Sequence, residues 1–417
     1  MKNPKVCMRA LVAVAGFALS QQSGAVPGTV IRPEYPSPFV PVSISADGQT
    51  IAGMGPQDYY GPPAAVWSPA IGFSPIGWWP SQPWHRAMSA DGSKIAGQLF
   101  WTRDWRYEGA YIWSAGGFRF PPTSSENGRA LALTADGSNL LWADNASSFG
   151  LYVWDGANQE LITSETPFAA AISDDASIVA YISPQTGELR RWTRGAGLST
   201  LPPPPGAVVE ELDVIMSADG SRVYAFTLSA DSVALVRWDC AGPAVATQEL
   251  CTFPRPGMGY PSAMLAGMSA DEKTIAFSFA GAPYIWTEGD GLRTFEDFLV
   301  SRGIEFGPHV NLQVWAMNKD ATVFTGTERT LVPWADDDST FWYLDLNNAP
   351  GFCAADRNYD RVVDDADFVM FAAAYNFFDC ANGEMLLACP CDFNRDGVVD
   401  DADFAVFAGA YDDLVCP

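Results

Sequence analysis

A short motif that recurs along most of the chain constrains its fold more than any other feature. Each copy has a small polar residue, one further residue, Asp and in most cases Gly, followed by a short run of β-forming residues. The seven copies are Ser45-Ala46-Asp47-Gly48, Ser89-Ala90-Asp91-Gly92, Thr134-Ala135-Asp136-Gly137, Ser173-Asp174-Asp175-Ala176, Ser217-Ala218-Asp219-Gly220, Ser269-Ala270-Asp271-Glu272 and Asn318-Lys319-Asp320-Ala321. The aspartates of successive copies are 39 to 52 residues apart. Self-similarity at a period of this length is typical of repeat architectures, so the repeat has to be interpreted before any single residue.

Each repeat carries the signals for four short strands. One strand precedes the Asp-Gly turn, a second follows it, a third ends in Trp, and a Gly-rich turn leads to a fourth. The seven tryptophans are Trp67, Trp113, Trp154, Trp192, Trp238, Trp286 and Trp342. Four strands make one propeller blade, and blades close into a ring because a single blade cannot bury both faces of its sheet. The sequence predicts a mainly β fold, a seven-bladed β-propeller over residues 26–348.

The seventh repeat ends near Leu346 without an evident fourth strand. The segment from Thr29 to Arg32 is a candidate for that strand and would close the ring, which leaves few free sheet edges.

The repeated aspartates and tryptophans each have two interpretations. The aspartates could be metal ligands or catalytic groups, but Asp followed by Gly is hairpin chemistry, in which Asp caps the turn and Gly supplies positive φ. The tryptophans could form a binding ladder, but packing between blades is the simpler role for large apolar rings. We expect the structural role in both cases.

The repeat also resembles a known family. Residues Ala87-Met88-Ser89-Ala90-Asp91-Gly92-Ser93-Lys94-Ile95-Ala96-Gly97, with Ala110-Tyr111-Ile112-Trp113, are similar to the HAF-type extracellular repeat of secreted bacterial proteins. The stretch from Leu292 to Phe306, with a helical turn expected at residues 295–299, resembles the insertion before the last repeat of such proteins. The resemblance covers about 300 residues and implies the propeller fold, which hosts many functions.

A second kind of repeat occupies residues 353–417. Its later copy places oxygen donors at loop positions 1, 3, 5, 7, 9 and 12: Asp392, Asn394, Asp396, the backbone carbonyl of Val398, Asp400 and Asp403. A loop of 12 residues needs this spacing to wrap calcium in six or seven oxygens, and Gly397 at position 6 allows the sharp turn. The sequence therefore predicts a calcium site.

The earlier copy lies 36 residues upstream. Its predicted ligands are Asp356, Asn358, Asp360, the carbonyl of Val362, Asp364 and Asp367. Arg361 stands at position 6 where the later copy has Gly397, so we expect this site to be the weaker one.

The residues that follow the two loops are almost the same. Residues 362–368 and 398–404 match at every position, and residues 371–375 parallel 407–411. The phenylalanines Phe368, Phe371, Phe404 and Phe407 fall on one helical face of each copy and should pack the copies together. The alternative, a solvated acidic run, does not account for this duplication.

Loop position 12 is Asp in both copies, and each copy shows only the helix that follows the loop. Both features are typical of dockerins. With flanking cysteines, residues 353–417 resemble the GC-type dockerin-like domain of planctomycete-like bacteria, joined to the propeller by a linker at residues 349–352. The resemblance implies calcium as cofactor and a cohesin-like or other envelope scaffold protein as partner. Loop positions 10 and 11, often Ser and Thr in cellulosomal dockerins, are Asp365-Ala366 and Asp401-Ala402 here, which argues against a cellulosomal cohesin.

The charge is unevenly distributed. The formal net charge is -25, and residues 353–417 hold 14 Asp or Glu against 3 Arg, or -11. This balance repels nucleic acid and anionic membrane and suits a cation-binding module.

The N-terminus has the pattern of a secretion signal. Lys2, Lys5 and Arg9 precede an apolar run over residues 10–19, and small residues end at Ala25. The run is too short to span a bilayer, so we expect a signal peptide at residues 1–25, a secreted protein and no membrane span.

The cysteine spacing suggests disulfides in an oxidising compartment. Cys353 to Cys380 and Cys389 to Cys416 are each 27 residues apart, one pair per calcium repeat, and Cys240 with Cys251 is a candidate third bond. Cys7 would leave with the signal peptide. Cys391 is left over as a buried thiol or an intermolecular link.

The propeller shows no catalytic motif, and its two histidines, His85 and His309, lie in unrelated repeats. Long loops of repeats 1, 2 and 7 and the first link between blades carry aromatic residues, which we interpret either as a patch for a glycan or protein segment or as packing on their own blades: Trp78, Trp79, Trp84, Trp101, Trp105 and Trp334. The leading interpretation is a secreted, calcium-dependent, scaffold- or surface-attached binding protein. The alternative is a dockerin-anchored carbohydrate-active enzyme, a hydrolase or lyase.

Overall fold

The computed structural model describes residues 30, 39–55, 63–99, 109–122, 128–145, 149–242, 244–255, 263–302, 304, 310–329, 339–346, 365–375 and 398–413. Antiparallel strands dominate as far as residue 346, and two helices follow it.

The first three blades take up residues 40–163. Blade 1 consists of β1 (Val40–Ile44), β2 (Ile51–Met54), β3 (Pro63–Ser68) and the first half of β4 (Gly72–Met88). Blade 2 consists of the second half of β4 with β5 (Ile95–Leu99), β6 (Gly109–Ser114) and β7 (Gly117–Arg119). Blade 3 consists of β8 (Arg129–Leu133), β9 (Leu140–Asp144), β10 (Gly150–Trp154) and β11 (Gln159–Thr163).

The next four blades take up residues 170–345. Blade 4 consists of β12 (Ala170–Ile172), β13 (Ile178–Ile182), β14 (Leu189–Thr193) and β15 (Gly197–Leu201). Blade 5 consists of β16 (Val208–Met216), β17 (Arg222–Leu228), β18 (Ser232–Asp239) and β19 (Ala246–Pro254). Blade 6 consists of β20 (Ala263–Met268), β21 (Thr274–Phe279), β22 (Ala282–Thr287) and β23 (Gly291–Thr294). Blade 7 consists of β24 (Val310–Met317), β25 (Val323–Arg329) and β26 (Ser339–Asp345).

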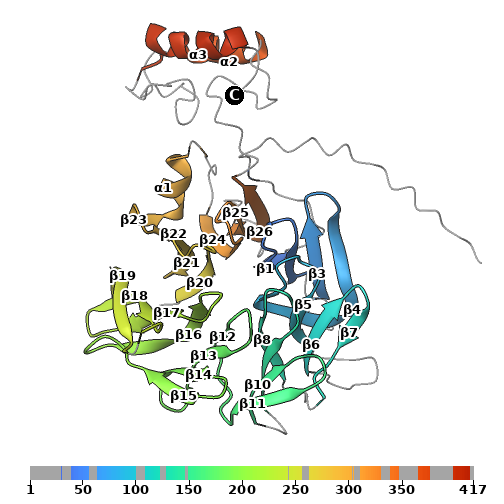
Figure 1. Ribbon diagram of the computed structural model, residues 1–417. Coiled ribbons are helices and arrows are strands. Elements are labelled where there is room, and N and C mark those ends of the chain that lie inside the picture. The colour runs from blue at the N-terminus through green and yellow to red at the C-terminus, as the bar shows by residue number, and fades with distance from the viewer. Residues whose placement is uncertain are drawn as a thin grey trace, which may run out of the picture.

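These blades follow one another around a ring, from blue through green and yellow to orange in Figure 1. The long strand β4 joins the first two blades: residues near Gly72 pair with β3, and residues near Met88 pair with β5. The seven-bladed β-propeller that the repeats predict is confirmed.

The apolar core is divided into layers between neighbouring blades. Leu141 and Leu151 of blade 3, for example, pack with Val179 and Tyr181 of blade 4. Six of the seven repeat tryptophans are buried, and Trp113 is partly buried against the layer between blades 1 and 2. Burying side chains of this size stabilises the ring by about 1.5–3 kcal/mol each. Their role in packing is confirmed.

Blade 7 has three strands within the described residues. The expected helical turn is present as α1 (Phe295–Val300), whose N-cap Thr294 accepts a hydrogen bond from the amide of Asp297. Phe295 and Phe298 pack with Trp342 in the layer between blades 6 and 7. Val30, from the segment predicted to be the missing strand, is buried in this layer but lies outside any strand, and residues 31–38 are outside the described part.

Two helices, α2 (Asp365–Tyr375) and α3 (Asp401–Asp413), form the described part of the C-terminal repeats. Among the described residues, no helix has the length and apolar character needed to cross a membrane.

Candidate functional site

The Asp-Gly turns set the geometry around the centre of the ring. In blade 1, Ser45 Oγ donates to Asp47 Oδ1 over 2.6 Å, and the amide of Gln49 donates to the same oxygen over 3.0 Å. The amide of Thr50 donates back to Ser45 Oγ over 2.9 Å. The same bonds recur in blades 2 to 6. The turn-capping role predicted for these aspartates is confirmed.

This capping favours the ionised carboxylate of Asp91. Hydrogen bonds from Ser89 and Ser93 lower the pKa of Asp91 to about 2, because they stabilise the charged form. The carboxylate oxygens are therefore occupied within their own turns.

The residue after the capping aspartate lies close to the preceding blade. Gly48 has a φ of 75°, and a Cβ added there would lie 2.5 Å from Val323 Cγ2 of blade 7. A Cβ on Gly220 would lie 2.6 Å from Ile178 Cδ1 of blade 4. Glycine thus serves two needs, positive φ and room for the preceding blade.

In four of the repeats, the residue before the capping aspartate donates a backbone hydrogen bond to the next blade. Four such bonds run from Ala46 N to Ala90 O (2.8 Å), Ala90 N to Ala135 O (2.6 Å), Asp174 N to Ala218 O (2.8 Å) and Ala270 N to Lys319 O (2.7 Å). Asn318 Nδ2 also donates to Ala46 O over 3.3 Å, which ties blade 7 to blade 1. These bonds hold one rim of the central opening in place.

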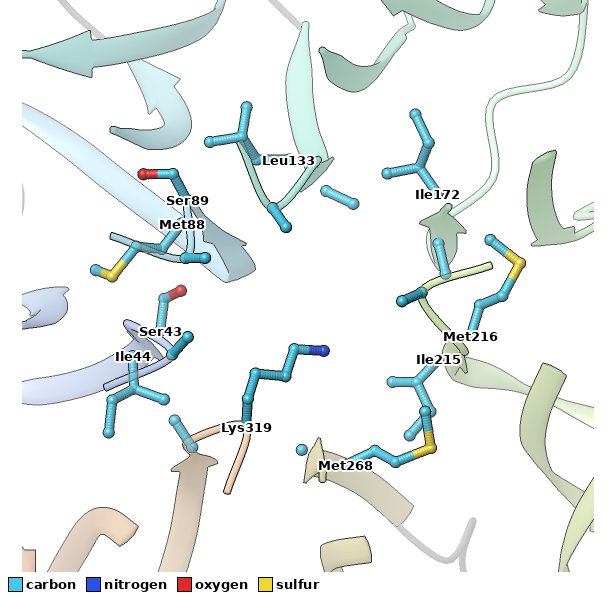
Figure 2. Close-up of a pocket in the computed structure, with 18 of the residues that line it drawn as sticks. Ser43, Ile44, Met88, Ser89, Leu133, Ile172, Ile215, Met216, Met268 and Lys319 are labelled. Atoms are coloured by element: carbon cyan, nitrogen blue, oxygen red, sulfur yellow. The ribbon is translucent and has the colours of Figure 1, made fainter. Parts of the chain in front are cut away.

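The first strands of all seven blades line a central channel of about 160 Å³ (Figure 2). Its wall is mainly apolar, and one ring of equivalent positions within it consists of Ile44, Met88, Leu133, Ile172, Met216, Met268 and Met317. A concave, mostly apolar site with a few polar groups is the usual form of a small-ligand pocket.

Two charged residues distinguish the rim of this channel. Asp174 in blade 4 and Lys319 in blade 7 occupy positions that are alanine in the other repeats, and both line the channel. Figure 2 shows the Lys319 side chain extending into the open space. The sequence already contained the signal, a departure from alanine in two motif copies, but only closure of the ring places both residues at one opening.

The structure describes only the backbone of part of the aromatic patch predicted from the loops. Trp78, Trp79 and Trp84 lie on β4, as does His85, but their side chains are not among those described. Trp101, Trp105, Trp334 and His309 lie outside the described residues. The patch stays a prediction.

The predicted Cys240–Cys251 disulfide is wrong, because both residues are free thiols. Cys251 pairs across the strands with Leu235, five positions from Cys240 and so about 16 Å away along β18. The two side chains also pack into different layers, Cys240 with the core between blades 4 and 5 and Cys251 with that between blades 5 and 6. The other predicted bonds, Cys353–Cys380 and Cys389–Cys416, and Cys391 lie outside the described residues.

The duplicated helices pack against each other as predicted. Phe371 of α2 stacks on Phe407 of α3 with ring centroids 5.2 Å apart, and Phe368 lies 6.4 Å from Phe404. Tyr375 Oη donates to Asp401 Oδ1 over 2.7 Å, which raises the tyrosine pKa. Equivalent residues of the two copies therefore meet in one shared core.

Helix α3 begins with a reciprocal cap made by two predicted calcium ligands. Asp400 Oδ1 accepts from the amide of Ala402 over 2.8 Å, and Asp403 Oδ2 accepts from the amide of Asp400 over 3.0 Å. This arrangement satisfies two of the free amides at the start of the helix. Asp403 is 0% exposed.

The described donors fit a calcium loop. A carboxylate offers about four acceptor sites, so Asp400 and Asp403 can cap the helix and still face a cation. A fully buried carboxylate such as Asp403 needs strong partners, and a hard cation is one. Within the described residues no group of three or more His, Cys, Asp or Glu could hold a metal ion. Most predicted ligands lie outside that part: Asp356, Asn358, Asp360, Val362, Asp364, Asp392, Asn394 and Asp396, while the side chain of Asp367 is not described.

Comparison with known proteins supports the fold. No protein-family model matches the chain, and no curated protein matches it either. The β-propeller domain of Cps50 (Swd1) from Myceliophteria thermophila is similar over 75% of this chain and 98% of that chain, with 12% identity and a TM-score of 0.51.

Two further solved structures are similar at lower scores. TolB from Acinetobacter baumannii matches over 51% of this chain and 54% of its own, with 16% identity and a TM-score of 0.38. Hydrazine synthase from Kuenenia stuttgartiensis matches over 63% and 80%, with 14% identity and a TM-score of 0.42. At these identities the likeness concerns the propeller fold alone.

Proposed function

We propose that the chain is a secreted β-propeller that acts as a binding protein and is attached through a calcium-binding, dockerin-like C-terminal module. The observation that carries this proposal is the pairing of the duplicated helices. Phe371 and Phe407, equivalent residues of the two copies, stack at the centre of their shared core. A module that repeats both its loops and its packing residues is built as one unit.

Calcium would act on this module by completing the turn before each helix. In the second copy, the Val398 carbonyl and the carboxylates of Asp400 and Asp403 would contribute oxygens from the described part of the loop. Because Asp400 and Asp403 also start α3, a bound cation would stabilise the helix whose Phe404 and Phe407 pack on α2. Attachment would thus depend on calcium.

The partner we propose is a cohesin-like or other envelope scaffold protein outside the cell. The near-identity of the two copies supports a docking surface that can be used in two orientations. The aspartates at loop position 10 favour a partner with a basic rim, since Asp365 and Asp401 are both exposed.

The test uses the full secreted chain, residues 26–417. We expect calorimetry to detect a stronger and a weaker calcium site, and an envelope fraction to retain the protein in calcium but release it in chelator. Asp403→Asn should abolish the stronger site. Asp219→Asn, in an aspartate that caps a propeller turn, is the matched control and should leave calcium binding unchanged. Retention that is equal in calcium and in chelator would contradict the proposal.

An assay of the same protein on polysaccharides distinguishes the proposed binding role from the enzymatic alternative. Saturable binding to a polysaccharide without release of reducing ends or unsaturated products supports a binding protein. Turnover would instead support an anchored hydrolase or lyase.

A further inference from the structure

A cavity of about 240 Å³ lies between blades 2 and 3, away from the central channel. Lys94 and Ser114 line it from blade 2, and the turns of blade 3 at Gly137 and Gly156 line it from the other side. Arg119 of β7 also borders it. The cavity therefore opens on the face that carries the Asp-Gly turns.

Two cations reach this cavity, and both are held by neutral carbonyl groups. Lys94 Nζ donates to Gly137 O over 2.9 Å, and Arg119 Nη2 donates to Gly156 O over 2.9 Å. The Arg119 guanidinium also lies 5.5 Å from the centroid of the Trp154 ring. In the described ranges, neither side chain is part of a salt bridge. Both keep further N–H groups for a ligand, in positions fixed by the blade 3 backbone.

Two carboxylates lie close by but mainly serve their own turns. Asp136 Oδ1 accepts from Thr134 Oγ1 and from the amide of Ser138. Asp155 Oδ1 accepts from the amides of Asn158 and Ala157, which contributes to a pKa of about 2, whereas its Oδ2 accepts, within the described part of the chain, only the side-chain amide of Asn158, over 3.1 Å. Oxygen Oδ2 of Asp155 thus has capacity to accept a hydroxyl group.

The balance of these charges selects a particular kind of ligand. Two cations and two carboxylates offset each other at long range, so a simple anion gains little from general attraction. Affinity then depends on direct hydrogen bonds, namely charge-assisted donors for one anionic group and an acceptor for neutral hydroxyls. A sugar acid presents both kinds of group on one ring.

We propose that this crevice binds a hexuronate unit of an acidic polysaccharide. The sugar carboxylate lies between Lys94 and Arg119, where the guanidinium can donate two parallel N–H bonds. Ring hydroxyls donate to Asp155 Oδ2 and contact the hydroxyl of Ser114. The inference builds on the proposed binding role of the propeller and does not involve the calcium-dependent attachment.

The test measures binding of tri-galacturonate, tri-glucuronate and tri-mannuronate to the full secreted chain by calorimetry, with galactotriose and sulfate as comparisons. At least one uronate should bind, more weakly as salt rises, while galactotriose should not. Arg119→Gln and Lys94→Met should each lower the affinity about tenfold or more. Arg194→Gln is the control, because Arg194 is an exposed arginine paired with Glu160 of blade 3. It should leave the affinity unchanged.

Three results would overturn the inference: no uronate binds, Arg119→Gln binds as the unchanged protein does, or sulfate binds as tightly as the best uronate with the same dependence on Arg119. Thermal unfolding of each variant excludes loss of the fold as the cause. Calcium-dependent retention on the envelope fraction, measured on the same variants, reports the attachment separately. Its loss would refute the attachment and leave the crevice result standing.

Discussion

The interface between blades 2 and 3 holds a crevice, and the interface between blades 5 and 6 holds an ion pair at equivalent positions of the repeat. Lys94 and Arg222 each stand five residues after the first residue of their motif. Each reaches toward the residue that follows the capping aspartate of the next blade, which is Gly137 in one case and Glu272 in the other.

That one residue differs in the group it offers to the basic side chain. Glu272 pairs with Arg222 over 3.3 Å and accepts the hydroxyl of Tyr224, whose pKa is raised by burial and by this carboxylate. Gly137 supplies only a carbonyl, so Lys94 keeps capacity for a ligand. A single position of the repeat therefore decides whether the basic side chain of the preceding blade meets a carbonyl or a carboxylate.

The largest effect should come from breaking the ion pair between blades 5 and 6. Glu272→Ala removes the ion pair to Arg222 and leaves the buried hydroxyl of Tyr224 without its acceptor, so we expect a loss of about 2–3 kcal/mol in the free energy of unfolding. Urea denaturation measures it. Glu288→Gln, an exposed change in the same blade, should cost under about 0.5 kcal/mol. Equal effects of the two variants would refute the role of the ion pair.

A substitution in the crevice between blades 2 and 3 should cost less stability. Gly137→Ala forces a side chain onto a φ of 65° and brings Cβ within 2.7 Å of Lys94 Cδ, so we expect a loss of about 1–2 kcal/mol. Gly72→Ala separates the two causes, because Gly72 has a φ of 78° and nothing within 4 Å of an added Cβ. Thermal unfolding should rank Gly137→Ala as the less stable, and the reverse order would show that the contact with Lys94 is unimportant.

Comparing two replacements of Glu272 isolates its backbone strain. Glu272 has a φ of 61°, which costs an L-residue about 1 kcal/mol relative to Gly. Glu272→Gly should therefore be about 1 kcal/mol more stable than Glu272→Ala, although both lose the ion pair. If the alanine variant is equally stable, the strain argument fails at this turn.

The smallest expected effect is the response to acid, which blades 2 and 5 share. The pKa of Asp91 is lowered to about 2 in the folded protein, and that of Asp219 is lowered too, through hydrogen bonds within their turns. A lowered folded pKa contributes stability above the unfolded value near 4, and this is lost as pH falls toward 2. Asp91→Asn should destabilise more at pH 5 than at pH 3, as measured by urea unfolding. A pH-independent difference would argue against the cap.

The sequence repeats predicted some features of the candidate site and missed others. The motif predicted that Asp47 and its equivalents cap turns, and the phenylalanines of the last repeats predicted the contact between α2 and α3. The disulfide between Cys240 and Cys251 was misjudged, because proximity in sequence does not reveal strand register or the face on which a side chain packs. Lys94, Arg119 and Lys319 were not recognised as site residues, since each repeat considered alone gives no reason to single them out.

The sequence by itself determined that the chain repeats a four-stranded unit seven times, because turn chemistry and strand patterns act over a few residues. It also determined the duplicated spacing of oxygen-bearing residues at 356–367 and 392–403, because that spacing is local, and calcium binding there stays a prediction. Only the tertiary structure decided which residues meet across the blades. Closing the ring brings Asp174 and Lys319 to one channel opening and sets Lys94 against Gly137 but Arg222 against Glu272. These residues are some 40 to 145 positions apart in the chain, and no local pattern encodes their placement.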